Sequence, residues 1–255
     1  MSDSVRRAAQ RILASMQATY GGESTYLPAD EQEFRHLDLQ AYCQFQAQHE
    51  AKDFRYLCDT EIAEISASPT TLVARTYIRS MVSAHGAILA EYYQVKPRIG
   101  RLSRMLLRGL GNGRWIDTPR FVFRTLKTKH CISYTTELSN EHFITTSNAE
   151  SAGKIGSPPT IDSEFHPYGT PAQVVMERHL ARLKSRLEAE PQLRPLLLRD
   201  EEELLRRRRR MKRQKDAYRA AVNWVSKEEL EKMSSSPALA AAVYEEVRRQ
   251  LGVDA

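Results

Sequence analysis

Five consecutive arginines are the strongest chemical signal in this sequence. Clustered guanidinium groups bind phosphate oxygens in pairs, and such binding weakens as salt is added. The segment 206–215 therefore predicts contact with a polyanion such as nucleic acid. The candidate polyanion-binding residues are Arg206, Arg207, Arg208, Arg209, Arg210, Lys212 and Arg213.

The same segment also has the pattern of a self-stabilised, solvated helix. Consecutive residues of a helix point around the whole axis, so the five arginines cannot share one face. Glu202 and Glu203 each precede an arginine by four residues, an order that favours side-chain pairing and suits the helix dipole. A helix over about 196–222 with so few apolar residues has little to bury. We expect it to project from the rest of the protein or to form a homodimer contact.

A second basic segment, 96–115, contains no acidic residue and separates its charges from its leucines. An expected helix over 98–110 would have leucines on one side and arginines elsewhere. This composition is typical of a helix at an acidic lipid surface, and equally of a surface helix that packs its leucines on a sheet. The candidate membrane-surface residues are Arg98, Arg101, Arg104, Arg108 and Trp115.

Four carboxylates fall within predicted strands: Asp59, Glu61, Glu91 and Glu137. If the strands align them, they could hold a metal ion or act as a general acid and base, as in a hydrolase. Acidic residues are also common on the solvated face of an antiparallel sheet. Both interpretations stay open, because the sequence does not define the strand register.

Local catalytic signatures are lacking in the sequence. His130 and Cys131 are neighbours, but adjacent side chains of a strand point to opposite faces, so they cannot form a dyad without a bulge. No nucleophile elbow, zinc-protease motif or phosphate-binding glycine loop occurs, and the histidines lack metal-ligand spacing. We therefore predict no catalytic residue, no metal ligand and no cofactor.

The elements that position these residues predict an α+β fold. Helical spacing of apolar residues indicates helices over 4–19 and 39–51. Between residues 54 and 148 we expect a central, mostly antiparallel sheet of about five to six strands with one helical insertion. The candidate strands are 54–65, 71–80, 87–95, 120–128, 130–138 and 142–147.

The C-terminal part reads as helices after a loop over 149–169. Thr170 is the expected N-cap of a helix that ends near Glu190, and Ser226 the cap of a later one. A last helix is expected to begin at Ser236 and to end before Gly252. This organisation divides the chain into an α+β domain over 1–190 and a charged helical region over 191–255.

Composition places the chain among ordinary folded proteins, with 41% apolar and 27% charged residues and a net charge of +6. Three widely spaced cysteines indicate reduced thiols, and no apolar run approaches the ~20 residues that span a bilayer. We expect a cytoplasmic protein. The leading functional hypothesis is a non-catalytic binding or interaction protein, such as a bacterial regulatory, adaptor or immunity-type protein with a protein partner. Association with nucleic acid or acidic lipid, and a hydrolase, are the alternatives.

Overall fold

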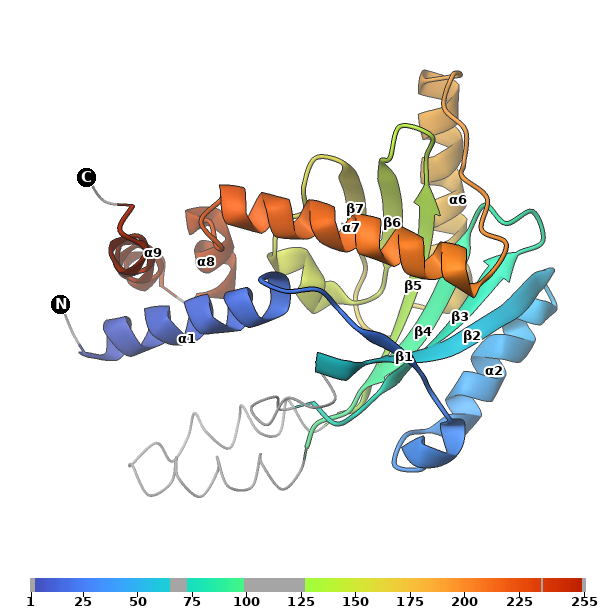
Figure 1. Cartoon of the computed structure of the whole chain (residues 1–255), viewed down its shortest axis with the longest axis horizontal. Coiled ribbons are helices and arrows are strands. Elements are labelled where there is room, and N and C mark those ends of the chain that lie inside the picture. Colours follow the sequence, from blue (N-terminus) through green and yellow to red (C-terminus); the bar gives the residue numbers. More distant parts are fainter. Residues whose placement is uncertain (1–2, 65–72, 99–126, 235, 254–255) are drawn as a thin grey trace.

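The computed structural model describes residues 3–64, 73–98, 127–234 and 236–253 (Figure 1). Its helices are α1 (Asp3–Tyr20), α2 (Leu39–Glu50), α6 (Ala172–Ala189), α7 (Glu201–Ala221), α8 (Lys227–Met233) and α9 (Pro237–Leu251), with short 3₁₀ helices at Glu31–Phe34 and Glu150–Lys154. Its strands are β1 (Tyr26–Pro28), β2 (Phe54–Ile62), β3 (Tyr77–Ser83), β4 (Leu89–Val95), β5 (Lys129–Glu137), β6 (Phe143–Ser147) and β7 (Ile161–Phe165). The expected helix over 98–110 and strand over 120–128 lie outside the described residues, apart from their terminal positions.

The strands form one seven-stranded sheet in the order of the chain, β1 to β7. Each pair of neighbours is antiparallel except β6 and β7, which run parallel. The predicted α+β fold with a mostly antiparallel central sheet is confirmed. The short connections β3–β4 and β5–β6 explain part of this success, since hairpin-linked strands carry their alternation and their turns in the local sequence.

Two strands lie outside the stretch where strands were expected. β1 is a three-residue edge strand that includes Pro28, a residue type that weakens any strand prediction. β7 occupies 161–165, so the prediction of a loop over the whole of 149–169 is wrong there. Its five residues do alternate, but the surrounding glycines and prolines concealed the strand, and its parallel pairing needs the crossover over 148–160.

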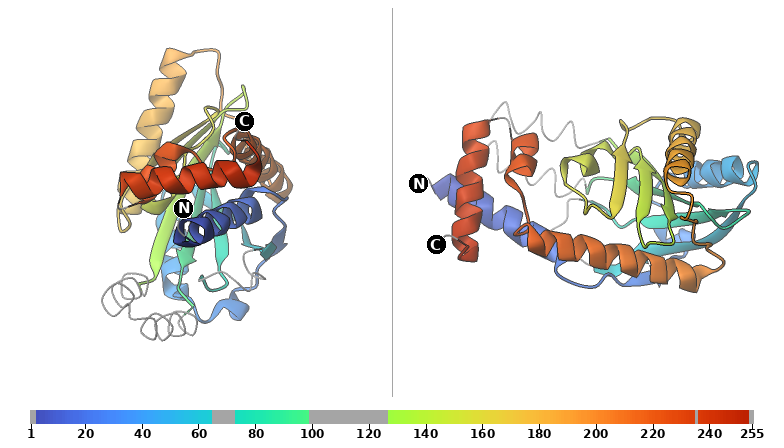
Figure 2. Two further views of the ribbon diagram at one scale, coloured as in Figure 1. Left: turned by 90° about the vertical axis from the view of Figure 1, so that its left-hand side faces the viewer. Right: turned by 90° about the horizontal axis from the view of Figure 1, so that it is seen from above.

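One face of the sheet packs against α2 and α6 (Figure 2). This is the main hydrophobic core, in which Tyr42 and Phe45 of α2 meet Tyr77 and Tyr92 of the sheet. Asp38 caps α2 by accepting from the amide of residue 41, as helix capping requires. The N-cap of α6, in contrast, is Pro171, whereas the Thr170 hydroxyl donates to the Pro167 carbonyl (2.8 Å), so the predicted threonine cap is wrong.

The other face of the sheet is covered by α7, which crosses the strands on the side opposite α6 (Figures 1 and 2). Leu204 is fully buried there with Cys58, Val82 and Leu89. Arg207 and Arg208 are buried as well. The expectation that this helix projects from the protein is therefore wrong. Polar side chains can point into this interface because the covered sheet face is itself polar and carries acidic residues that match the arginines.

A smaller apolar cluster joins α1, α8 and α9 beside one end of the sheet (Figure 2). Val5 and Ala9 of α1 pack against Val243 and Val247 of α9. The predicted cap at Ser226 is confirmed and forms a capping box with Glu229, and α9 ends as expected at a left-handed Gly252. Within the described residues, no helix is both long enough and apolar enough to cross a membrane.

Candidate functional site

Glu137, the last residue of β5, is the centre of a buried charge cluster. Its carboxylate is fully buried and accepts from two arginines of α7. Arg207 donates through Nε at 3.1 Å, and Arg210 donates through Nε and Nη2, each at 2.7 Å. Two positive charges thus share one negative charge, which leaves this cluster with an excess of one positive charge.

The segment that precedes α7 brings these arginines to the end of β5. Leu196 donates its amide to the Glu137 carbonyl (2.8 Å), and Ser139 donates to the Arg194 carbonyl (2.8 Å). The chain then enters α7 at Asp200, whose side chain caps the helix by accepting from Glu203 N. Residues three apart share a helix face, so Arg207 and Arg210 both point toward the C-terminal end of β5 at Glu137.

A groove of about 530 Å³ lies between this segment and α7. We call it the arginine groove. Five arginines and two glutamates contribute to its walls, so positive charge exceeds negative charge by three. Its lining consists of Glu137, Ser139, Arg194, Pro195, Leu196, Leu197, Leu198, Arg199, Glu203, Arg206, Arg207 and Arg210.

Arg207 is a buried cation of the groove whose hydrogen-bond donors are not all used among the described residues. Its Nη2 donates to the Leu196 carbonyl at 2.7 Å, but its Nη1 is buried and has no hydrogen-bond partner among the described residues. Burial lowers the pKa of Arg207 in spite of the attraction of Glu137. A buried donor without an acceptor costs free energy, so an acceptor at this position would stabilise the protein.

The seven predicted polyanion-binding residues separate into three groups. Arg206, Arg207 and Arg210 line the groove. Arg208 points onto the sheet face under α7, where it bonds Glu91, Thr60 and Ser80. Lys212 bonds Asp216 and the Gly22 carbonyl. The two that remain, Arg209 and Arg213, are exposed on the outer face of α7.

The four sheet carboxylates are distributed over two faces. Asp59 pairs with Arg79 (2.6 Å) and Glu61 with Arg75 (2.7 Å), on the side of α2. Glu91 pairs with Arg208 (2.5 Å) on the side of α7.

Of these carboxylates, only Glu91 and Glu137 share the face of α7, and the register separates them. Glu91 lies opposite Ser133, four residues before Glu137, which corresponds to about 13 Å along the strand. Each of the four carboxylates is thus engaged by an arginine. Among the described residues, no group of three or more His, Cys, Asp or Glu side chains is placed to hold a metal ion.

His130 and Cys131 point to opposite faces, as predicted. The His130 ring bonds Tyr92 (2.5 Å) on the side of α2. Cys131 is buried on the other side, and burial raises the pKa of its thiol to about 11. A thiol with such a pKa is a poor nucleophile at neutral pH.

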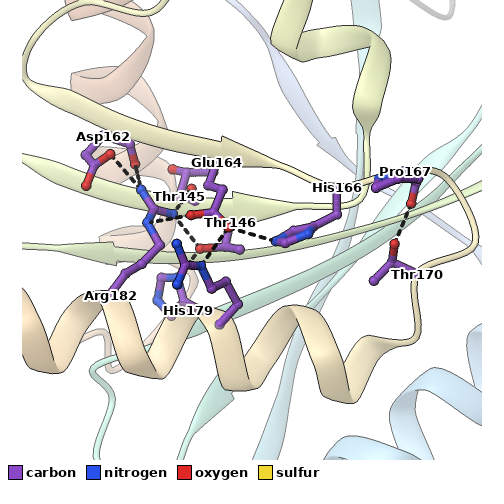
Figure 3. Close-up of polar contacts among 10 residues, drawn as sticks. Thr145, Thr146, Asp162, Glu164, His166, Pro167, Thr170, His179 and Arg182 are labelled. Atoms are coloured by element: carbon purple, nitrogen blue, oxygen red, sulfur yellow. Dashed lines mark hydrogen bonds and ion pairs between the residues drawn. The ribbon is translucent and has the colours of Figure 1, made fainter.

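A second polar cluster lies between α6 and the strands β6 and β7 (Figure 3). His179 is fully buried, with Nδ1 3.2 Å from Thr146 Oγ1 and Nε2 3.0 Å from Thr136 Oγ1. Burial lowers the pKa of His179 to about 3, so it is neutral at physiological pH. Both ring nitrogens have partners, which identifies a satisfied core histidine.

Arg182, one turn further along α6, completes this cluster (Figure 3). It donates to the Thr145 carbonyl (2.7 Å) and the Asp162 carbonyl (2.8 Å), and thereby joins β6 to β7. Arg178 of α6 bonds Glu164 of β7 (2.7 Å) and lowers the pKa of that carboxylate. These contacts hold α6 on the sheet, and we assign the cluster a structural role.

The candidate membrane-surface residues are placed only in small part. Arg98 is the last described residue of its segment, and it has an interaction partner. Arg101, Arg104, Arg108 and Trp115 lie outside the described residues.

The sequence predicted three arginines of the groove, Arg206, Arg207 and Arg210, but not Arg194 and Arg199 of the opposite wall. Arg194 and Arg199 belong to a connector that has no hydrophobic periodicity. Backbone hydrogen bonds between this connector and the end of β5 place the two arginines near Glu137. A weak signal was present in the run Leu196–Leu198. Three leucines between two arginines are unusual for a solvated linker.

Comparison of the chain with protein families, with curated proteins and with solved structures finds no match.

Proposed function

We propose that this protein is a non-catalytic binding protein that holds an acidic segment of a partner protein in the arginine groove. The observation that carries the proposal is the lining of the groove, where five arginines stand against two glutamates. Recognition of acidic motifs by clustered arginines is a recurring mode of peptide binding, because guanidinium groups pair with carboxylates bidentately. A regulatory or adaptor role would use such a site.

The apolar part of the groove favours a protein segment over nucleic acid. Leu196 and Leu197 are exposed to 36% and 53%, and both line the groove beside the arginines. Apolar and charged contacts side by side suit a peptide with mixed side chains. Nucleic-acid sites commonly add aromatic side chains on which bases stack, and none of the described residues that line this groove is aromatic.

The placement of the basic run supports the same choice. Arg207 and Arg208 are buried, and Lys212 is engaged by Asp216. A long polyanion would thus meet few open cations along α7, namely Arg209 and Arg213 beyond the groove. The sheet carboxylates give no comparable support to a hydrolase, because each one is already engaged by an arginine.

The proposal is tested with a fluorescent ten-residue peptide of alternating glutamate and leucine, followed by fluorescence anisotropy. We expect saturable binding that weakens as salt rises, since rim charges are screened. The double variant Arg194→Gln/Arg206→Gln should weaken binding about tenfold or more, because charge-assisted hydrogen bonds are lost. The matched control, Arg209→Gln/Arg213→Gln, removes the same charge from the same region and should change the affinity less than about twofold.

Two results would contradict the proposal. One is an equal loss of peptide affinity in both double variants, which would indicate diffuse attraction by net charge. The other is binding of a 20-nucleotide single strand that is tighter than peptide binding and is lost in the control variant. That outcome would favour nucleic acid as the ligand of the exposed face of α7.

A further inference from the structure

The part of the arginine groove around Arg207 has a charge that the protein does not neutralise. From this we infer that the groove is a site for a phosphate monoester dianion. The inference rests on the proposed function, because it names the charged group that the partner segment would place there. A phosphate monoester dianion occurs both on a phosphorylated side chain and in a free phosphate compound. The experiments below separate these two sources.

The first argument is the unbalanced charge at Glu137. Arg207 is only 2% exposed, and the carboxylate opposite it is also bound twice by Arg210. Buried charges normally occur with a full set of partners, since an uncompensated one has lost its hydration without replacement. Arg207 instead retains a buried Nη1 with no acceptor in the described part of the chain.

The second argument is the number of open donors beside Arg207. Arg210 uses Nε and Nη2 for Glu137, and its third nitrogen, Nη1, has no protein partner among the described residues. Arg206 is about half exposed, and within the described ranges its side chain bonds only Glu202, through Nη1 at 3.1 Å. Arg194 and Arg199, on the opposite wall, are exposed. Donors therefore reach the groove from two sides.

These donors suit a phosphate better than a carboxylate. A carboxylate offers two oxygens and one charge, so a single guanidinium fork satisfies it. A phosphate monoester has three acceptor oxygens and carries nearly two charges at neutral pH. It can therefore bond arginines from both walls at once, and its charge is closer to the groove's excess of three.

Nearby acids limit the site to the side of the groove away from Glu203. That carboxylate accepts from the Arg199 amide (2.7 Å) and lines the groove at the start of α7. An anion would be repelled there, whereas Arg206 and Arg210, one and two turns further along, each keep guanidinium nitrogens that their glutamate partners do not use. The phosphate is thus expected over the first two turns of the basic run.

The direct test measures binding of inorganic phosphate by titration with ³¹P NMR, with acetate as the competitor. We expect saturable binding to the full-length protein, and acetate should compete at least tenfold less well than phosphate. Arg206→Gln should weaken phosphate binding about tenfold, because a charge-assisted hydrogen bond is lost. Arg209→Gln, the matched control three residues along, should leave it within about twofold.

The second arm compares three peptides that are identical except at the central residue, which is phosphoserine, glutamate or serine. The phosphoserine peptide should bind about tenfold more tightly than the glutamate peptide at pH 7.5. This advantage should shrink at pH 5, because the second pKa of the phosphate is about 6 and the dianion becomes a monoanion.

The outcomes separate the inference from the function on which it rests. If the glutamate peptide binds and phosphoserine adds nothing, the inference is wrong while the proposed function stands. If inorganic phosphate binds but neither acidic peptide does, the ligand is a free phosphate compound, and the proposed function is wrong. The phosphate site itself is refuted by the absence of saturable phosphate binding, by acetate that competes equally, or by equal losses in the two arginine variants.

Discussion

Replacement of Glu137 by glutamine tests whether a buried carboxylate holds α7 on the sheet. Glu137→Gln preserves the shape of the side chain and removes only its charge. Glu137 is fully buried, and it accepts three hydrogen bonds from Arg207 and Arg210. After the substitution, Arg207 would remain buried without a counter-charge, whereas Arg210, whose side chain is 34% exposed, could turn to water.

The expected loss follows from this difference between the two arginines. Removal of one partner of a buried ion pair costs about 3–5 kcal/mol, because the other charge is left uncompensated. Since Arg210 can be rehydrated, we expect a value near the lower end, about 3 kcal/mol. Glu202→Gln is the matched control. Its carboxylate pairs with Arg206 on the surface and is 78% exposed, so the loss there should stay below about 1 kcal/mol.

The measurement is urea denaturation followed by circular dichroism in a buffer free of phosphate. Both variants and the original protein are compared at the same pH and salt. Phosphate is then added, because an anion bound at Arg207 should restore part of the stability that Glu137→Gln removes.

A loss below about 1 kcal/mol for Glu137→Gln, or one equal to the control, would refute the reasoning. It would mean that the Arg207 guanidinium reaches water at little cost. The double variant Glu137→Leu/Arg207→Leu gives an independent check. Because both charges leave the interface together, it should be more stable than Glu137→Gln.

Three further predictions address the rest of the fold. Burial lowers the pKa of His179 to about 3, so the unfolded chain takes up a proton first as the pH falls below about 6.5, and stability is lost between pH 6.5 and 3. The loss is about 2 kcal/mol between pH 6.5 and 5, and urea titrations should show a weaker pH dependence in His179→Gln. Leu204→Ala should cost about 2–5 kcal/mol in the same assay, since Leu204 is fully buried under α7; a loss under 1 kcal/mol would argue against that packing. Ser226→Ala removes the cap of α8 and should cost about 1 kcal/mol, whereas Ser226→Asp should retain most of the stability.

The elements with local signals were predictable from the sequence. Residues 132–138 alternate in size and polarity, and the structure places 132–137 in β5 with the two sets on opposite faces and Leu138 directly after the strand. The capping box at Ser226 and the stop at Gly252 likewise lie where the residue types require them. In each case the deciding interaction joins residues only a few positions apart.

The candidate site was predictable only in part. The run 206–210 marked basic chemistry, but its alternative as a solvated helix could not be excluded, because the partners lie far away in the chain. Arg207 meets Glu137 across 70 residues, and Arg208 meets Thr60 across 148. Contacts of such separation leave no pattern in a single sequence.

The sequence by itself determined the residue types, the helix ends and the period-two strands, because propensity, capping and side-chain alternation act between near neighbours. Only the tertiary structure decided which arginines are buried and which line a groove. That choice depends on how α7 lies across the end of β5 and on the connector over 194–199, because side chains from these three segments line one groove.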